Sequence, residues 1–214
     1  MTTNPRSNKV SDEQLIEVAR EAAQLEVQAV AQVVQQIDGT LPEVIRLIKS
    51  RPEGKVLITG GGTSSHIARR MAHLLAVSGT PALFVHSMDA LHGTMGAIEP
   101  RDVLIAISKG GESDEINQLC TLVRDKGTAI IGIGEHPEST LASISDVFVH
   151  LHTIDGGDPG NALAMGSTLL AALWGDALAR TLMSVNSWKL ADSLAIHPAG
   201  YVGKMSASLD HHEE

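Results

Sequence analysis

The chain has 214 residues, of which 43% are hydrophobic, 19% charged and 2% aromatic, with a formal net charge of −9 at pH 7. This is the composition of a globular protein of about one domain, and the negative charge disfavours binding to nucleic acid and to anionic membranes. A single cysteine excludes an intramolecular disulfide and indicates a reducing compartment, so we expect a cytoplasmic protein.

The N-terminal part of the chain is predicted to form two helices. Residues 1–11 are polar and lack the apolar run of an export signal. From Ser11 onward a capping box with Gln14 and an apolar stripe at three- and four-residue spacing predict a long amphipathic helix over residues 11–37. The stripe consists of Leu15, Val18, Ala22, Leu25, Ala29 and Val33. A second capping box at Thr40 predicts a shorter helix to about residue 49. We expect residues 1–50 to pack on the domain and to contribute an oligomer contact.

The rest of the chain alternates between short apolar runs and helical patterns. Such alternation is typical of βαβ units in a parallel sheet with helices on both faces. We therefore predict an α/β three-layer sandwich of the flavodoxin-like type over residues 51–203, an irregular segment after residue 188, and a disordered acidic tail over residues 204–214. The predicted strands are 56–59, 82–86, 103–108, 129–133 and 147–152, and the predicted helices are 67–77, 112–126, 139–145 and 162–184. The most apolar segment, residues 162–174, is too short to span a bilayer.

Two strands of this predicted sheet run into glycine-rich turns that open helices. The first turn is Gly60-Gly61-Gly62-Thr63-Ser64-Ser65-His66, and the second is Ser108-Lys109-Gly110-Gly111-Glu112-Ser113. Free amides and hydroxyls at a helix N-terminus bind anions, and the carboxyl ends of parallel strands meet at one edge of a sheet. The first turn lacks the residues of a P-loop and of a dinucleotide fingerprint. The pair therefore predicts a phosphate site rather than a nucleotide site, although each turn alone is also compatible with an ordinary tight turn.

These two turns resemble the phosphate-binding loops of sugar isomerase (SIS) domains. The resemblance extends, in order, through further segments that are similar to the arabinose-5-phosphate isomerase family and covers about residues 50–203. These segments are Phe84-Val85-His86, Asp89-Ala90-Leu91-His92-Gly93, Ile105-Ala106-Ile107-Ser108, Pro137-Glu138-Ser139-Thr140-Leu141-Ala142, Gly175-Asp176-Ala177-Leu178-Ala179 and His197-Pro198-Ala199-Gly200. The chain is identified as a member of this family.

The resemblance implies an aldose–ketose isomerase that acts on a sugar phosphate through an enediol, without metal or cofactor. It implies catalytic roles for His92, Glu115 and His197, residue types that suit proton transfer near neutral pH. The implied phosphate-binding set, with the loop residues around it, is Gly62, Thr63, Ser64, Ser108, Lys109, Gly110, Ser113, Ser167 and Thr168. It also implies a homo-oligomer, a dimer or a tetramer, in which His197 of a neighbour completes each site.

The sequence departs from the family pattern at three places. Thr63 stands where the first loop usually has lysine, Lys109 brings a cation into the second loop, and Gly156 lies where a Lys-Glu pair usually follows the fifth strand, although Asp155 or Asp158 could partly substitute. We therefore expect a substrate preference that differs from arabinose 5-phosphate. Longer family members continue into CBS domains, and because the sequence ends at residue 214 we expect no regulation through them.

Other functions remain open at this point. A non-catalytic sugar-phosphate sensor or regulator is favoured by the missing lysine and glutamate, and opposed by the retained histidines. Amide transfer or deamination of an amino sugar is weaker, because no glutaminase domain is attached. His150 and His152, with Asp155 and Asp158 nearby, have too few ligands at fixed spacing to indicate a metal site.

Overall fold

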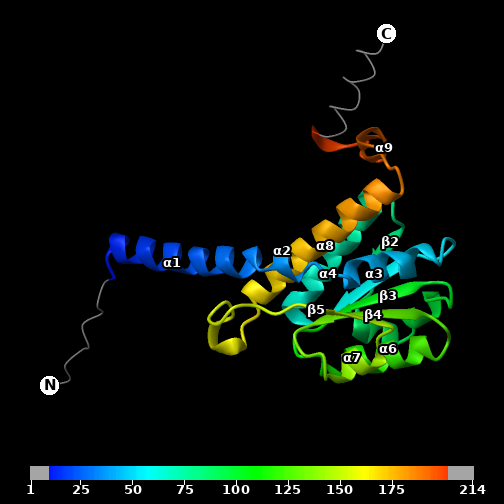
Figure 1. Ribbon diagram of the computed structural model, residues 1–214, viewed down its shortest axis with the longest axis horizontal. Coiled ribbons are helices and arrows are strands. Elements are labelled where there is room, and N and C mark those ends of the chain that lie inside the picture. The colour runs from blue at the N-terminus through cyan, green and yellow to red at the C-terminus, as the bar shows by residue number, and fades with distance from the viewer. Residues whose placement is uncertain (1–9, 202–214) are drawn as a thin grey trace, which may run out of the picture.

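The protein, described here by a computed structural model over residues 10–201, contains one five-stranded parallel sheet (Figure 1). Its strand order is β2-β1-β3-β4-β5, the order of flavodoxin-like folds. The strands are β1 Val56–Gly60, β2 Ala82–Phe84, β3 Val103–Ile107, β4 Ala129–Gly134 and β5 Val147–His150. The predicted sheet is confirmed, although β2 and β5 end two residues earlier than expected.

Helices cover both faces of this sheet, because alternate residues of the central strands are apolar toward each side (Figure 1). Ile58, Ile105 and Ile131 belong to one buried core, and Leu57 and Leu104 belong to the other. The first core contains α3 Thr40–Lys49, α4 Gly62–Val77 and α8 Gly166–Val185; the second contains α5 Ser87–Leu91, α6 Asp114–Arg124 and α7 Thr140–Ile144. The predicted three-layer sandwich is therefore confirmed.

The N-terminal helix projects from the body of the protein (Figure 1). The predicted helix over residues 11–37 divides at Gln32 into α1 Asp12–Ala31 and α2 Val33–Gln36. At its start the predicted capping box is present, since Gln14 N donates to Ser11 Oγ at 3.2 Å and Ser11 N donates to Gln14 Oε1 at 2.9 Å. The apolar stripe is buried only at its C-terminal end. Ala29 and Val33 are buried, whereas Leu15, Val18 and Leu25 are exposed.

Two local predictions were wrong. Thr40 does not cap α3 but is its first residue, and its amide donates to Asp38 Oδ1 at 2.8 Å. The segment after residue 188 is not wholly irregular, because it contains α9 Leu190–Ala195, which Ser193 attaches to the body by donating from Oγ to Val77 O at 2.8 Å. The 3₁₀ turns Thr94–Ala97 and Pro159–Asn161 were also not predicted.

Two sequence-based expectations concern the ends of the chain and the membrane. The predicted disordered tail, residues 204–214, lies outside the described residues. Within residues 10–201, none of the helices has the length and apolar character needed to cross a bilayer.

Candidate active site

The first predicted loop forms a tight connection between β1 and α4. Gly60 must lack a side chain, because a Cβ there would lie 2.9 Å from the carbonyl carbon of Ser64. Gly62 begins α4 in a left-handed conformation, with φ of 50°, which glycine adopts without strain. Ser64 lies in the first turn and is 9% exposed. Its hydroxyl therefore sits beside the unpaired amides of a helix N-terminus, where an anion is stabilised.

The second loop is held together by its own serines. Ser108 Oγ accepts from Gly111 N at 3.2 Å and lies 3.3 Å from Ser113 Oγ, at the N-cap of α6. Gly111 has φ of 70°, and a Cβ at this position would lie 2.2 Å from Ser139 Oγ. The loop thus has one compact conformation that only glycine permits at this position.

The two loops and the N-terminus of α8 meet at a small cavity on the carboxyl edge of the sheet. β1 and β3 are neighbours, and Gly60 pairs with Ile107 at the ends of the two strands. The cavity is lined on its polar side by Ser64, Lys109, Ser167 and Thr168, and by the ends of β3 and β4. The structure therefore brings together four of the predicted phosphate-binding residues, from three segments that are distant in sequence.

The remaining loop residues of the predicted set lie around this cavity. Ser108 and Ser113 are paired with each other inside the second loop. Gly62, Thr63 and Gly110 are exposed at the loop tips. An adjoining cavity of about 420 Å³ contains Glu135 as a shared wall residue and continues along residues 153–161. The cavity at the loops is much smaller, about 20 Å³, so the larger space lies beside it rather than within the loops.

Lys109 and Asp158 form a largely buried ion pair between the second loop and α8. Lys109 Nζ lies 2.6 Å from Asp158 Oδ2, and the Asp158 side chain is 1% exposed. Asp158 Oδ1 accepts from the amides of Met165 at 2.8 Å and Ser167 at 3.0 Å. Burial by itself would raise the pKa of Asp158, but the hydrogen bonds from Lys109 and Ser167 outweigh it and lower that pKa. Asp158 is therefore an ionised cap of α8, a role that the sequence reasoning missed.

Of the three predicted catalytic residues, one lies against the first loop. A Cβ on Gly61 would lie 3.2 Å from Glu115 Oε1, which places this carboxylate beside the backbone of the first loop. His92 is the C-cap of α5, beyond the carboxyl end of β2, and is exposed. Glu115 therefore lies between the two loops. His92 lies toward the edge of the sheet that is formed by the carboxyl ends of the strands.

His197 lies at the other end of the molecule. Its Nδ1 is 2.5 Å from Ser193 O, and Ser193 contacts Val77 at the C-terminus of α4. Ser64 is at the N-terminus of the same helix, 13 residues away, so at a rise of 1.5 Å per residue the two ends are about 20 Å apart. The structure does not bring His197 together with the loops of its own chain.

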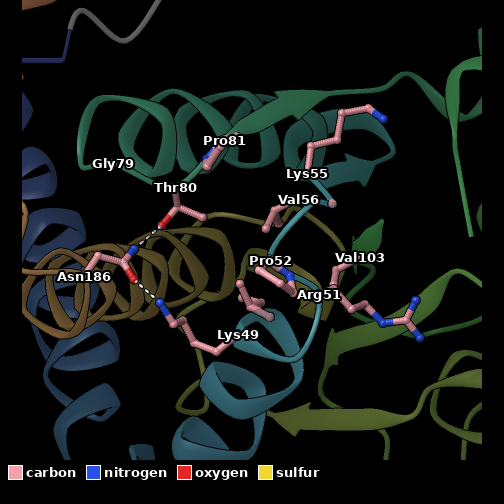
Figure 2. Close-up of a pocket in the computed structure, with 12 residues that line it drawn as sticks. Lys49, Arg51, Pro52, Lys55, Val56, Gly79, Thr80, Pro81, Val103 and Asn186 are labelled. Atoms are coloured by element: carbon pink, nitrogen blue, oxygen red, sulfur yellow. Dashed lines mark hydrogen bonds between the residues drawn. The ribbon is translucent and has the colours of Figure 1, made fainter. Parts of the chain in front are cut away.

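A cavity of about 220 Å³ at the opposite edge of the sheet also contains cationic residues (Figure 2). The charged groups of these residues already form hydrogen bonds or ion pairs within the protein. Lys49 Nζ donates to Asn186 Oδ1 at 2.7 Å, Arg51 donates to the carbonyl of Gly127 at 3.0 Å, and Lys55 Nζ pairs with the buried Asp102 at 2.6 Å. In Figure 2 the charged ends of Arg51 and Lys55 point away from the neighbouring lining residues. This cavity lies at the amino ends of the strands, where open α/β sheets do not place their ligands.

The histidine pair at the end of β5 lacks further ligands. The rings of His150 and His152 have centroids 5.3 Å apart. Within residues 10–201, no group of three or more histidine, cysteine, aspartate or glutamate side chains is placed to hold a metal ion.

Comparison with known proteins identifies the family of the chain. The SIS domain family model matches residues 50–174. Arabinose 5-phosphate isomerase KpsF of Escherichia coli is 36% identical over 194 residues, which cover 90% of this chain and 59% of that protein. Arabinose 5-phosphate isomerase KdsD of Francisella tularensis is 37% identical over 188 residues, which cover 87% of this chain and 58% of that protein. The chain thus spans a little under 60% of the length of these two relatives.

Solved structures show the same fold. A protein of Escherichia coli CFT073 in complex with A5P has a TM-score of 0.79 and 31% identity, covering 88% of this chain and all of that one. A protein of Listeria monocytogenes has a TM-score of 0.84 and 29% identity, covering 89% of this chain and all of that one. The SIS domain model matches more than half of the chain, and the chain belongs to the SIS domain family.

Proposed function

We propose that the protein is an isomerase that interconverts an aldose phosphate and a ketose phosphate. The observation that carries this proposal is the convergence of both serine-rich loops and the first turn of α8 on one cavity, with Glu115 against the first loop. In this proposal Ser64 at the cavity, Ser108 and Ser113 in the second loop, and the amides of the two helix N-termini hold the phosphate. The similar proteins named arabinose 5-phosphate isomerase support the class of reaction.

The reaction needs a base for a carbon-bound proton and groups that move protons between two oxygens. Glu115 would take the proton under this proposal, which its position beside the backbone of the first loop supports. His92 would exchange protons with the sugar oxygens, since histidine titrates near neutral pH. Loop amides and helix ends stabilise the negative charge of the enediol intermediate.

We further propose that each site is shared between copies of the chain in a homo-oligomer. His197 lies beside the C-terminal end of α4, and the phosphate loop is at the other end of this helix, about 20 Å away by helix rise, so we assign His197 to the site of a neighbour. The projecting helix α1 offers a contact surface, since Leu15 is 57% and Val18 64% exposed. Apolar side chains at this exposure on a protruding helix favour burial against a second copy.

Arabinose 5-phosphate is not the preferred substrate under this proposal. Relative to the family pattern, Thr63 removes the lysine of the first loop, the segment around Gly156 supplies no glutamate, and Lys109 adds a cation. A site that hydrogen-bonds particular hydroxyls rejects sugars that lack them, so these changes shift specificity. The substrate is a sugar phosphate of another length or configuration, and we place the reaction in the cytoplasm.

Incubation with a panel of tetrose, pentose and hexose phosphates in deuterated water tests the proposal. An isomerase incorporates deuterium at C1 or C2 of its substrate, and kcat/KM ranks the sugars. The highest kcat/KM on arabinose 5-phosphate would contradict the shifted preference. Tight binding of one sugar without exchange would instead establish the alternative, a non-catalytic sensor, which the absence of the family's lysine and glutamate at Thr63 and Gly156 favours.

A further inference from the structure

We propose that Lys109 is a positioning residue, which holds the first turn of α8 against the phosphate loops through Asp158 and does not itself bind the phosphate. This inference rests on the proposed function, because it assigns a role within the same site. Lys109 lies in a predicted phosphate-binding loop, where a lysine would be expected to contact the phosphate directly. The groups around its ammonium indicate a different role.

The ammonium group of Lys109 is already neutralised within the protein. It lies 2.6 Å from Asp158 Oδ2 and 3.7 Å from Glu135 Oε2, and it donates to Asn161 Oδ1 at 2.6 Å. One cation beside two carboxylates leaves this cluster with a net negative charge. It therefore supplies no attractive field for a phosphate, and the loop amides and hydroxyls must do so.

The other oxygen of Asp158 connects the lysine to α8. Oδ1 accepts from the amides of Met165 and Ser167, which are the unpaired donors at the start of the helix. These amides lie in the same turn as Ser167 and Thr168, the two polar α8 residues that line the cavity. The position of the first turn thus depends on a carboxylate whose own position depends on Lys109.

Backbone hydrogen bonds hold the second loop, which carries Lys109, in place. Glu135 N donates to Lys109 O at 2.8 Å, so the second loop is tied to the end of β4. Gly166 N donates to Gly157 O at 3.0 Å beside the ion pair. Lys109 therefore links a rigid strand end to the helix turn that closes the cavity.

The test combines amide hydrogen exchange with binding of inorganic phosphate and of arabinose 5-phosphate. In Lys109→Met we expect the amides of Met165 and Ser167 to exchange about tenfold faster and affinity for both ligands to fall about tenfold, because hydrogen bonds to a charged group are weakened. Asp158→Asn should reproduce both effects, and the double variant should be no worse than either single one, because the residues act as a unit. If Lys109→Met does not fold, Lys109→Gln replaces it with the same expectations.

A matched control is available at the opposite edge of the sheet. Lys55 and Asp102 form an ion pair of the same 2.6 Å length, also with a 1% exposed aspartate. Lys55→Met should change neither exchange at Met165 and Ser167 nor ligand affinity.

Two results would overturn the proposal. One is unchanged exchange at Met165 and Ser167 in Lys109→Met; the other is unchanged or tighter phosphate binding in Asp158→Asn, which would mean that the freed lysine contacts the ligand. Exchange is measured without ligand, so a failure of the proposed function would appear separately, as wild-type protein that binds and turns over no sugar phosphate.

Discussion

Replacing Ser64 and Ser113 together by alanine is the most direct perturbation of the phosphate site. One hydroxyl comes from each loop, Ser64 being 9% exposed beside the cavity and Ser113 lying 3.3 Å from Ser108. A hydrogen bond to a charged group contributes roughly 1.5–3 kcal/mol, so losing two costs about 3–6 kcal/mol. Affinity for a sugar phosphate should therefore fall by at least about 100-fold.

Isothermal titration with the preferred sugar phosphate measures this change. Ser78→Ala is the matched control, because Ser78 caps the opposite end of the same helix, is 8% exposed and donates to Leu74 O within that helix. It should leave the dissociation constant unchanged. A loss below about tenfold in the double variant would refute the assignment of the loops as the phosphate site, since even one such bond is worth about that factor.

Three further predictions concern stability and assembly. Gly111→Ala should lower the free energy of unfolding in urea by about 1–3 kcal/mol because its φ is 70°, whereas Gly39→Ala, with no atom within 4 Å and φ of −60°, should not. Burial by itself raises the pKa of Asp102, but hydrogen bonds, led by that from Lys55, lower this pKa on balance. Ionised Asp102 therefore stabilises the fold above the unfolded pKa of about 3.9, and this stabilisation is lost as the pH falls through the folded pKa. In Lys55→Met the folded pKa of Asp102 moves back toward the unfolded value, so the loss of stability on acidification should become smaller, and an unfolding free energy with an identical pH profile would contradict this. Val18→Glu should leave the fold intact and reduce the sedimenting mass, and an unchanged assembly would exclude α1 as the contact.

The sheet and both loops were predictable because their signals are local. Runs such as Val103–Ile107 are apolar throughout, as strands buried on both faces must be. The sequence Gly60-Gly61-Gly62 between such a run and a helical pattern indicates a tight turn without knowledge of any contact. The carboxyl-edge location of the site then follows from the parallel arrangement.

The features that were missed depend on contacts between distant segments. Nothing near Asp158 in sequence indicates that its carboxylate caps a helix seven residues later while pairing with Lys109, 49 positions earlier. The break at Gln32 lies four residues before Gln36, which exchanges two hydrogen bonds with the backbone of His152. α9 has six residues and is attached by Ser193 to the end of α4, so tertiary contact rather than propensity stabilises it.

Both phosphate loops end at helix N-termini. This arrangement determines how the affinity for a phosphorylated ligand should change as the pH falls. Helix dipoles and backbone amides of α4 and α6 carry partial positive charge that no proton can remove. A phosphate monoester, by contrast, gains a proton near pH 6 and loses half of its charge. Between about pH 5 and 7 the affinity of this site should therefore follow the ionisation of the ligand, and a phosphonate analogue with a different second pKa should shift the whole binding curve by that difference.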